Sequence, residues 1–197
     1  MSVPRFPRLP PEAPQVDSVW RRAFGCIGLA LLGWRIEGNL PNLRKFVVVV
    51  APHTSNWDFV IGILVYFALR VEAAWLAKHT ALAGPWGRLG RYLGAIAVDR
   101  SQAGAVVDTC VREFERRERM MIAIAPEGTR RRVIEWKRGY HRIALAAGVP
   151  IVPAALDFSR KRVLFGEPLV ASEDYAADYA KLRSFFRADM ARYPDQF

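Results

Sequence analysis

Apolar residues along the chain fall into short continuous runs that are typical of strands and longer runs with helical spacing. Lys45–Ala51 is a valine-rich run, and such a run indicates a strand that is buried on both faces, as in a parallel sheet. After Ser101, which is placed to cap a helix, apolar residues recur at helical spacing from Val106 to Phe114. Strands that alternate with helices predict an α/β fold, with a central, largely parallel or mixed sheet flanked by helices.

The remaining elements follow from the same pattern and its stop signals. A proline-rich arm, residues 1–16, holds five prolines and cannot form a helix, and residues 17–197 are expected to form a single domain. Gly148 is a typical helix stop, and Ser172 is expected to open the C-terminal helix. Further helices are expected over 17–34, 57–70, 84–94 and 140–147, and further strands over 73–78, 95–98, 120–125, 151–158 and 162–165.

Two uncharged apolar runs require a membrane test. Ala23–Trp34 and Phe59–Leu69 hold 12 and 11 residues. As helices they extend about 16–18 Å, whereas the hydrocarbon core of a bilayer is about 30 Å thick. We therefore expect no spanning helix, and neither run fits a secretory signal peptide. The second run is expected in the core, whereas the first, between Arg22 and Arg35, fits either core packing or an amphipathic helix at a membrane interface.

Composition narrows the class of protein. The chain has 197 residues, a formal charge of +10 and 52% hydrophobic residues, which excludes a disordered chain. The charge belongs to residues 1–163, which carry +12, whereas residues 164–197 carry −2. A basic surface fits nucleic acid, an anionic membrane or an acidic substrate. Cys26 and Cys110 form no metal or disulfide pattern and are expected as buried thiols.

Common catalytic signatures are absent from the sequence. It has no GxSxG elbow, no GxGxxG or GxxxxGK[ST] loop and no HExxH helix, which disfavours a serine hydrolase, a nucleotide-binding enzyme and a zinc protease. A polar loop remains, after the valine-rich strand, and it contains His53 and Asp58. Sites in α/β folds are usually built at such strand ends.

His53 and Asp58 stand five residues apart, which corresponds to about 140° between their directions on a regular helix. They can meet only if His53 lies in the loop and Asp58 in the first helical turn, with Thr54, Ser55 or Asn56 as the cap. A carboxylate bonded to one ring nitrogen would leave the other nitrogen as a general base. Ordinary capping of a helix explains the same residues equally well.

Three further blocks lie at predicted strand ends: Gly94–Arg100 (GAIAVDR), Ala125–Arg130 (APEGTR) and Val149–Pro153 (VPIVP). Together with His-x4-Asp, and in this order, they closely resemble the glycerophospholipid acyltransferase family of the lysophosphatidic acid type. The family pattern is His-x4-Asp, Gly-x-Ile-x-x-x-Arg, Pro-Glu-Gly-Thr-Arg and Val-Pro-Ile-Val-Pro, and it covers residues 45–160 here. One such short motif would be weak evidence for the family, whereas all four in this order are specific to it.

The resemblance implies an O-acyltransferase that moves a fatty acyl group from acyl-CoA or acyl-ACP to the hydroxyl of a lysophospholipid, with no cofactor and no metal. It implies that His53 deprotonates the acceptor and that Asp58 orients His53. Because no run spans a bilayer and basic residues lie at the same strand ends as His53 and Glu127, we expect peripheral attachment to an anionic membrane surface, on the cytoplasmic face, and no nucleic acid partner. The residues implied to bind the acceptor are Arg100, Glu127, Gly128, Thr129 and Arg130, with Lys78 and Lys137 as less specific basic positions.

Some features leave alternatives open. Pro52 and Trp57 depart from the family pattern, so a bulky side chain beside Asp58 is expected to reshape the acceptor pocket, and another lipid or alcohol is a possible acceptor. A lipid-binding relative without activity has the same sequence features. The basic clusters 130–132 and 160–162 fit a nucleic-acid-binding module. His79 and His141 are rival bases, for which surface or structural roles are expected.

Overall fold

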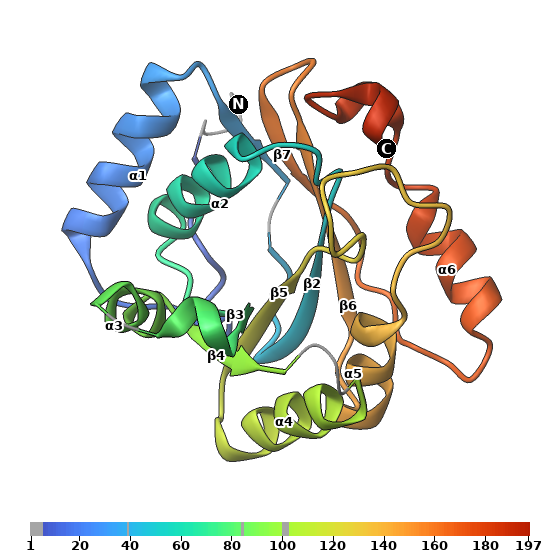
Figure 1. The fold of residues 1–197 in the computed structure, drawn as a ribbon. Coiled ribbons are helices and arrows are strands. Elements are labelled where there is room, and N and C mark those ends of the chain that lie inside the picture. The colour runs from blue at the N-terminus through green and yellow to red at the C-terminus, as the bar shows by residue number, and fades with distance from the viewer. Residues whose placement is uncertain (1–5, 39, 84, 100–102) are drawn as a thin grey trace.

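The computed structural model describes residues 6–38, 40–83, 85–99 and 103–197. Over these residues the chain forms a mixed seven-stranded sheet with the order β1-β7-β6-β2-β5-β3-β4 (Figure 1). Neighbouring strands are parallel except β6 and β7, which confirms the predicted α/β class. The strands are β1 (Arg35–Glu37), β2 (Lys45–Ala51), β3 (Ala73–Lys78), β4 (Ala95–Val98), β5 (Met120–Ile124), β6 (Ile151–Asp157) and β7 (Arg162–Phe165).

Helices cover both faces of this sheet, with α1 and α2 on one face and α4 and α5 on the other (Figure 1). The α-helices are α1 (Val19–Leu31), α2 (Trp57–Ala68), α3 (Pro85–Tyr92), α4 (Ala103–Arg116), α5 (Gly139–Ala147) and α6 (Tyr175–Arg183). Three 3-10 helices are η1 (His79–Leu82), η2 (Ala188–Met190) and η3 (Pro194–Gln196).

Most predicted elements are present, and the differences have local reasons. Gly148 ends α5 with a φ of +62°, as expected of a left-handed helix stop. Ser172 does not open α6, which corrects the prediction. Asp174 is the N-cap, because its side chain accepts the N–H of Ala177, whereas the Ser172 hydroxyl accepts the N–H of Asp174. Strand β1 was not predicted, and the expected cap Ser101 lies outside the described residues.

Strand β2 is buried from both sides, as its valine run predicts. Val47 and Val49 belong to the core under α4 and α5, whereas Phe46 and Val48 belong to the core under α1 and α2. Successive strand residues point to opposite faces, so an apolar residue is needed at every position. The strand that carries the His53 loop is therefore the centre of the fold.

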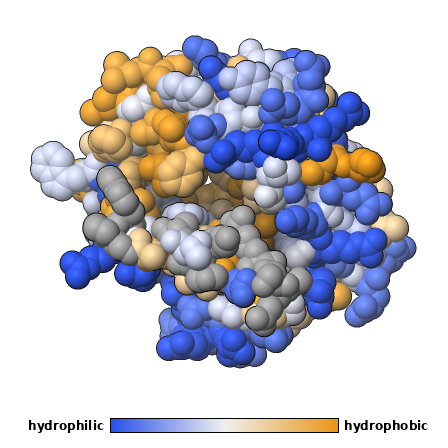
Figure 2. Space-filling view, viewed as in Figure 1, coloured by the Kyte–Doolittle hydropathy of each residue, from blue (hydrophilic) through white to orange (hydrophobic). Residues whose placement is uncertain are grey.

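Helix α1 packs closely on α2 through small residues. A Cβ atom on Gly25 would lie 2.2 Å from the backbone nitrogen of Ala68, so only glycine allows this approach. The opposite face of α1 is apolar but exposed, which gives the orange surface in Figure 2. Core packing, one of the two alternatives for this helix, is thus confirmed on the side that faces α2. The other alternative, contact with a membrane interface, stays a prediction that the exposed apolar side allows. The exposed residues are Trp20, Phe24, Ile27 and Leu31.

Helix α2 only partly fits the expectation of a core helix. Ile61 and Leu64 are buried, but Phe59 and Val60 near its start are exposed. None of the helices in the described ranges is both long enough and apolar enough to cross a bilayer.

The described part of the proline-rich arm is strapped to the domain. Gln15 forms an antiparallel bridge with Val71, and the N–H of Val16 donates to the carbonyl of Arg70. The arm is therefore held against the segment that joins α2 to β3.

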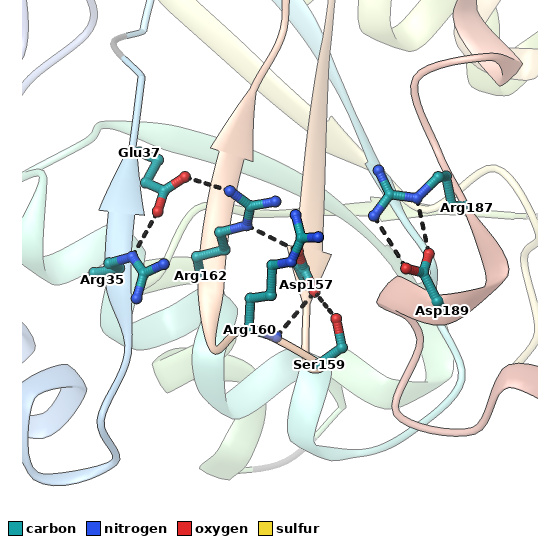
Figure 3. A network of polar contacts seen from close by, with 8 residues as sticks. All are labelled: Arg35, Glu37, Asp157, Ser159, Arg160, Arg162, Arg187 and Asp189. Carbon is teal, nitrogen blue, oxygen red and sulfur yellow. Dashed lines mark hydrogen bonds and ion pairs between the residues drawn. The ribbon is translucent and has the colours of Figure 1, made fainter.

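An ion-pair network joins β1, β6 and β7 at one side of the sheet (Figure 3). The Arg162 guanidinium contacts Asp157 at 2.8 Å and Glu37 at 2.6 Å. Burial raises the pKa of Asp157, but hydrogen bonds from Ser159, Arg162 and the Arg160 N–H outweigh it and hold the pKa below its ordinary value. The charge of Arg162 is thus neutralised by two carboxylates. This argues against the prediction that residues 160–162 bind nucleic acid.

Buried polar groups outside the sheet have structural roles. His141 is buried, and its Nε2 lies 2.8 Å from Asp178, so it joins α5 to α6 rather than lying at the surface. Burial raises the pKa of Cys110 to about 12, as expected of an inert thiol. Cys26 is only half-buried, which corrects the prediction that both thiols are buried.

Candidate active site

The His53 loop brings an imidazole onto a buried carboxylate. His53 follows the end of β2, Asp58 lies in the first turn of α2, and Nδ1 of His53 lies 3.2 Å from Oδ2 of Asp58. The Asp58 side chain is 2% exposed and that of His53 is 24% exposed. The arrangement is the one that the five-residue spacing allows, and it leaves Nε2 of His53 available for proton transfer.

Ser55 holds Asp58 in place. Its N–H donates to Asp58 Oδ2 at 2.7 Å, and its hydroxyl donates to Oδ1 at 3.2 Å. The same hydroxyl accepts the N–H of Trp57 at 3.1 Å, so Ser55 satisfies the start of α2. Asn56 occupies the N-cap position without a side-chain cap bond. Ser55 therefore caps the helix and orients the carboxylate.

Glu127 joins the second loop to the first. Strands β2 and β5 are parallel neighbours, so the loops after them leave the same edge of the sheet. Glu127 Oε1 accepts the backbone N–H of His53 at 3.0 Å. Burial raises the pKa of Glu127, and hydrogen bonds from its own N–H and from His53 offset only part of this effect. The buried Oε2 has no hydrogen-bond partner among the described residues.

One large cavity of about 1110 Å³ contains His53 and Asp58 in its wall. Figure 2 shows a hollow on this face, between the orange surface over α1 and α2 and a region of hydrophilic side chains. The polar part of the wall includes Gly128, Thr129, Arg130 and Lys137, which the sequence proposed as acceptor ligands. The apolar part includes Val48, Val50, Val65, Leu69, Ala154, Leu156 and Phe165.

Gly128 allows the Lys137 side chain to lie close to the main chain of the Glu127–Arg130 loop. Its φ is +65°, and a Cβ there would lie 3.0 Å from Nζ of Lys137. The Lys137 N–H in turn donates to the carbonyl of Pro126 at 3.0 Å. These contacts place Lys137 over the loop that carries Arg130.

Two of the predicted acceptor ligands are not placed by the structure. Arg100 lies outside the described residues. Lys78 ends β3, two strands from β2, and its side chain is not among those described. Among the described residues, no group of three or more His, Cys, Asp or Glu side chains gathers in a way that could hold a metal ion.

Trp57 corrects an expectation about the acceptor pocket. It does not line the large cavity, and its side chain instead lines a separate groove of about 530 Å³. Arg192 lies over the Trp57 ring at 5.6 Å from the ring centroid. Because Trp57 is not part of the wall of the large cavity, its bulk does not narrow that cavity.

Residues near the C-terminus also reach the site, and the sequence analysis missed them. The N–H of Tyr193 donates to Thr54 Oγ1 at 3.3 Å, across 139 residues of sequence. Gln196 lies beside the same loop. No motif marks these positions, because their contact depends only on how the C-terminal segment folds back.

Comparisons with known proteins show the family to which the chain belongs. The Acyltransferase family model matches residues 34–157, well over half of the chain, so the chain belongs to the Acyltransferase family. A 1-acyl-sn-glycerol-3-phosphate acyltransferase of Salmonella typhimurium is 27% identical over 163 residues, which cover 78% of this chain and 64% of that protein. A putative acyltransferase of the same name from Caenorhabditis elegans is 36% identical over 134 residues, 61% of this chain and 43% of that protein.

The crystal structure of the 1-acyl-sn-glycerophosphate acyltransferase PlsC from Thermotoga maritima has the same fold. It superposes with a TM-score of 0.60 and 21% identity, over 84% of this chain and 76% of that one. The chain spans a little under two thirds of the length of the Salmonella relative.

Proposed function

We propose that this protein is a glycerolipid O-acyltransferase, which moves a fatty acyl group from an acyl thioester to the hydroxyl of a lysophospholipid such as 1-acyl-glycerol-3-phosphate. The observation that carries the proposal is the contact between His53 and Asp58 in the wall of a cavity with one apolar and one basic part. Membership of the Acyltransferase family and the names of the relatives support it.

In the proposed reaction, Nε2 of His53 removes the proton from the acceptor hydroxyl while Nδ1 faces Asp58. The acceptor oxygen attacks the thioester carbonyl carbon, and a tetrahedral intermediate forms. Its collapse breaks the carbon–sulfur bond, and the departing thiolate takes the proton that His53 holds. Asp58 stabilises the imidazolium between these two proton transfers. No acyl-enzyme is needed, in agreement with the missing serine elbow.

The two parts of the cavity suit the two parts of the substrates. Arg130 and Lys137 offer positive charge to the acceptor phosphate, and an arginine can donate two parallel hydrogen bonds to it. The acyl chain would lie along the apolar part between α2 and the sheet, which excludes water. We assign Glu127 to holding the His53 loop, because its Oε1 already accepts the His53 N–H.

We further propose peripheral attachment to an anionic membrane through the outer face of α1. Trp20, Phe24, Ile27 and Leu31 lie within about 60° of one another around the helix at 100° per residue. All four are exposed, and two of them, Trp20 and Leu31, are more than 80% exposed. An apolar stripe of this kind on a basic chain fits the interface of an anionic bilayer.

The test is a transfer assay with purified protein, a labelled acyl-CoA or acyl-ACP, and a panel of lysophospholipids and other alcohols, read by mass spectrometry. We expect one acylated product class, and its loss in His53→Ala with thermal unfolding unchanged. A His53→Ala protein with the wild-type rate would refute the mechanism. Product from a non-phosphate alcohol alone would indicate another acceptor, and no product from any acceptor would indicate a lipid-binding relative.

A further inference from the structure

The C-terminal turn, residues 193–197, contacts both loops of the proposed active site. The Gln196 amide nitrogen, in the orientation that satisfies its hydrogen bonds, donates to the carbonyl of Arg130 at 2.6 Å and to the carbonyl of Thr54 at 3.1 Å. The N–H of Tyr193 adds a bond to Thr54 Oγ1 at 3.3 Å. Thr54 follows His53 directly, and Arg130 is the proposed acceptor ligand of the other loop.

The turn is itself anchored in the body of the domain. Pro194 begins the 3-10 helix η3, and the N–H of Gln196 donates to the carbonyl of Tyr193. The Arg183 guanidinium lies 4.0 Å from the centroid of the Phe197 ring, and Trp136 packs on the same ring. The turn that carries Gln196 is therefore held in place on both sides of this residue, and Gln196 can hold the loops that it contacts.

Two links therefore join the His53 loop to the Arg130 loop. Glu127 joins them near the ends of β2 and β5, where its carboxylate accepts the His53 N–H. Gln196 joins them through a second pair of contacts, and both of its bonds go to main-chain carbonyls. Hydrogen bonds to the main chain restrain the backbone of each loop, and they do not depend on the side chains that the loop carries.

We propose that Gln196 is a positioning residue, which sets the distance between His53 and Arg130 and so aligns the acceptor hydroxyl with the base. The inference rests on the proposed function for its kinetic consequence. Gln196 lies beyond residues 34–157, the range that the family model matches. A displacement of about 1 Å between reacting groups can cost roughly a hundredfold in rate, so a small loosening is measurable.

The experiment compares three substitutions of Gln196 with one substitution of the neighbouring residue Asp195. Gln196→Leu removes the donor, Gln196→Glu replaces it with an acceptor that faces two carbonyls, and Gln196→Lys restores a donor. Asp195→Asn is the matched control, because Asp195 is exposed and its side chain makes no hydrogen bond or ion pair within the described part of the chain. Each purified protein is assayed for kcat, both KM values, the melting temperature and backbone hydrogen exchange in residues 53–56 and 127–131.

We expect Gln196→Leu and Gln196→Glu to lower kcat about tenfold and to raise the KM for the acceptor, with the KM for the acyl donor unchanged. Hydrogen exchange should become faster in both loops and nowhere else, and Gln196→Lys should recover most of both effects. Wild-type kinetics and exchange in Gln196→Leu would overturn the proposal. So would a loss of activity that only follows a lower melting temperature.

The exchange measurement separates this proposal from the proposed function. If the wild-type protein transfers no acyl group, the proposed function fails. Faster exchange in both loops of Gln196→Leu then still supports the positioning role, and unchanged exchange refutes it.

Discussion

Nδ1 of His53 lies 3.2 Å from Oδ2 of Asp58, and the carboxylate is held there by two bonds from Ser55. A base and its orienting carboxylate act as one unit, so their losses should not add. We expect His53→Ala to lower kcat by roughly 10³-fold and Asp58→Asn by roughly 10²-fold or more. The double variant should be no slower than His53→Ala alone, and multiplied losses in single-turnover assays would contradict a shared role.

Glu127 should be needed for its acceptor oxygen rather than for its charge, because Oε1 accepts the N–H of His53. Glu127→Gln keeps an oxygen at this position, whereas Glu127→Leu leaves the N–H unpaired. We expect the leucine variant to lose at least about fivefold more activity than the glutamine variant, in line with a cost of about 1–3 kcal/mol for an unsatisfied buried group. If Glu127 bound the acceptor as a carboxylate, both variants would lose activity equally and raise the KM for the acceptor.

Gly62 should control the length of acyl chain that the cavity accepts. It lines the cavity, and a Cβ built on it meets no atom within 4 Å, so a larger side chain can extend into the empty space. We expect Gly62→Leu to lower kcat/KM for a 16-carbon donor at least tenfold relative to a 10-carbon donor. Gly104→Leu is the control, since Gly104 is also in a helix with open space around it but outside the cavity wall. An unchanged chain preference would place the acyl chain elsewhere.

The outer face of α1 should determine membrane binding. Trp20→Glu with Leu31→Glu introduces charge into the apolar stripe without touching the buried Gly25 face. Because burying one large apolar side chain is worth about 1.5–3 kcal/mol, we expect binding to phosphatidylglycerol vesicles to weaken at least tenfold in co-sedimentation. Val170→Glu, at another exposed apolar residue, should bind as the wild type does. Equal binding by the double variant would exclude α1 as the contact.

The Asp157–Arg162 pair should make stability depend on pH in the acidic range. The pKa of Asp157 is lower in the folded protein than its ordinary value, so its contribution is present at neutral pH and is lost as the pH falls through the folded pKa. Asp157→Asn should lower the free energy of unfolding by about 3 kcal/mol at pH 7, because it leaves Arg162 with Glu37 alone. Urea denaturation at pH 7 and pH 3 should show this difference shrinking in acid, and a constant difference would refute the pairing.

Much of the sheet could be predicted because a buried strand needs a continuous run of apolar residues, and such runs are visible in the sequence. The bounds of β2, β3, β4 and β7 agree with the apolar runs, whose ends are marked by charged, glycine or proline residues. β1 escaped notice because three residues, Arg35–Glu37, are too short for a pattern and form a strand only through pairing with β7. The sequence does not choose between Ser172 and Asp174 as the cap of α6, because serine and aspartate are equally good caps. In the structure Asp174 accepts the N–H of Ala177, whereas the Ser172 N–H donates to Asp178.

The sequence by itself determined the fold class and the spacing that lets His53 meet Asp58, because these depend on residues near one another in the chain. Only the tertiary structure decided that Glu127 accepts the His53 N–H, since this contact needs the parallel register of β2 and β5. It alone placed Trp57 outside the wall of the large cavity and brought Gln196 onto both loops. Contacts between distant segments follow from how the whole core packs, and no local pattern encodes them.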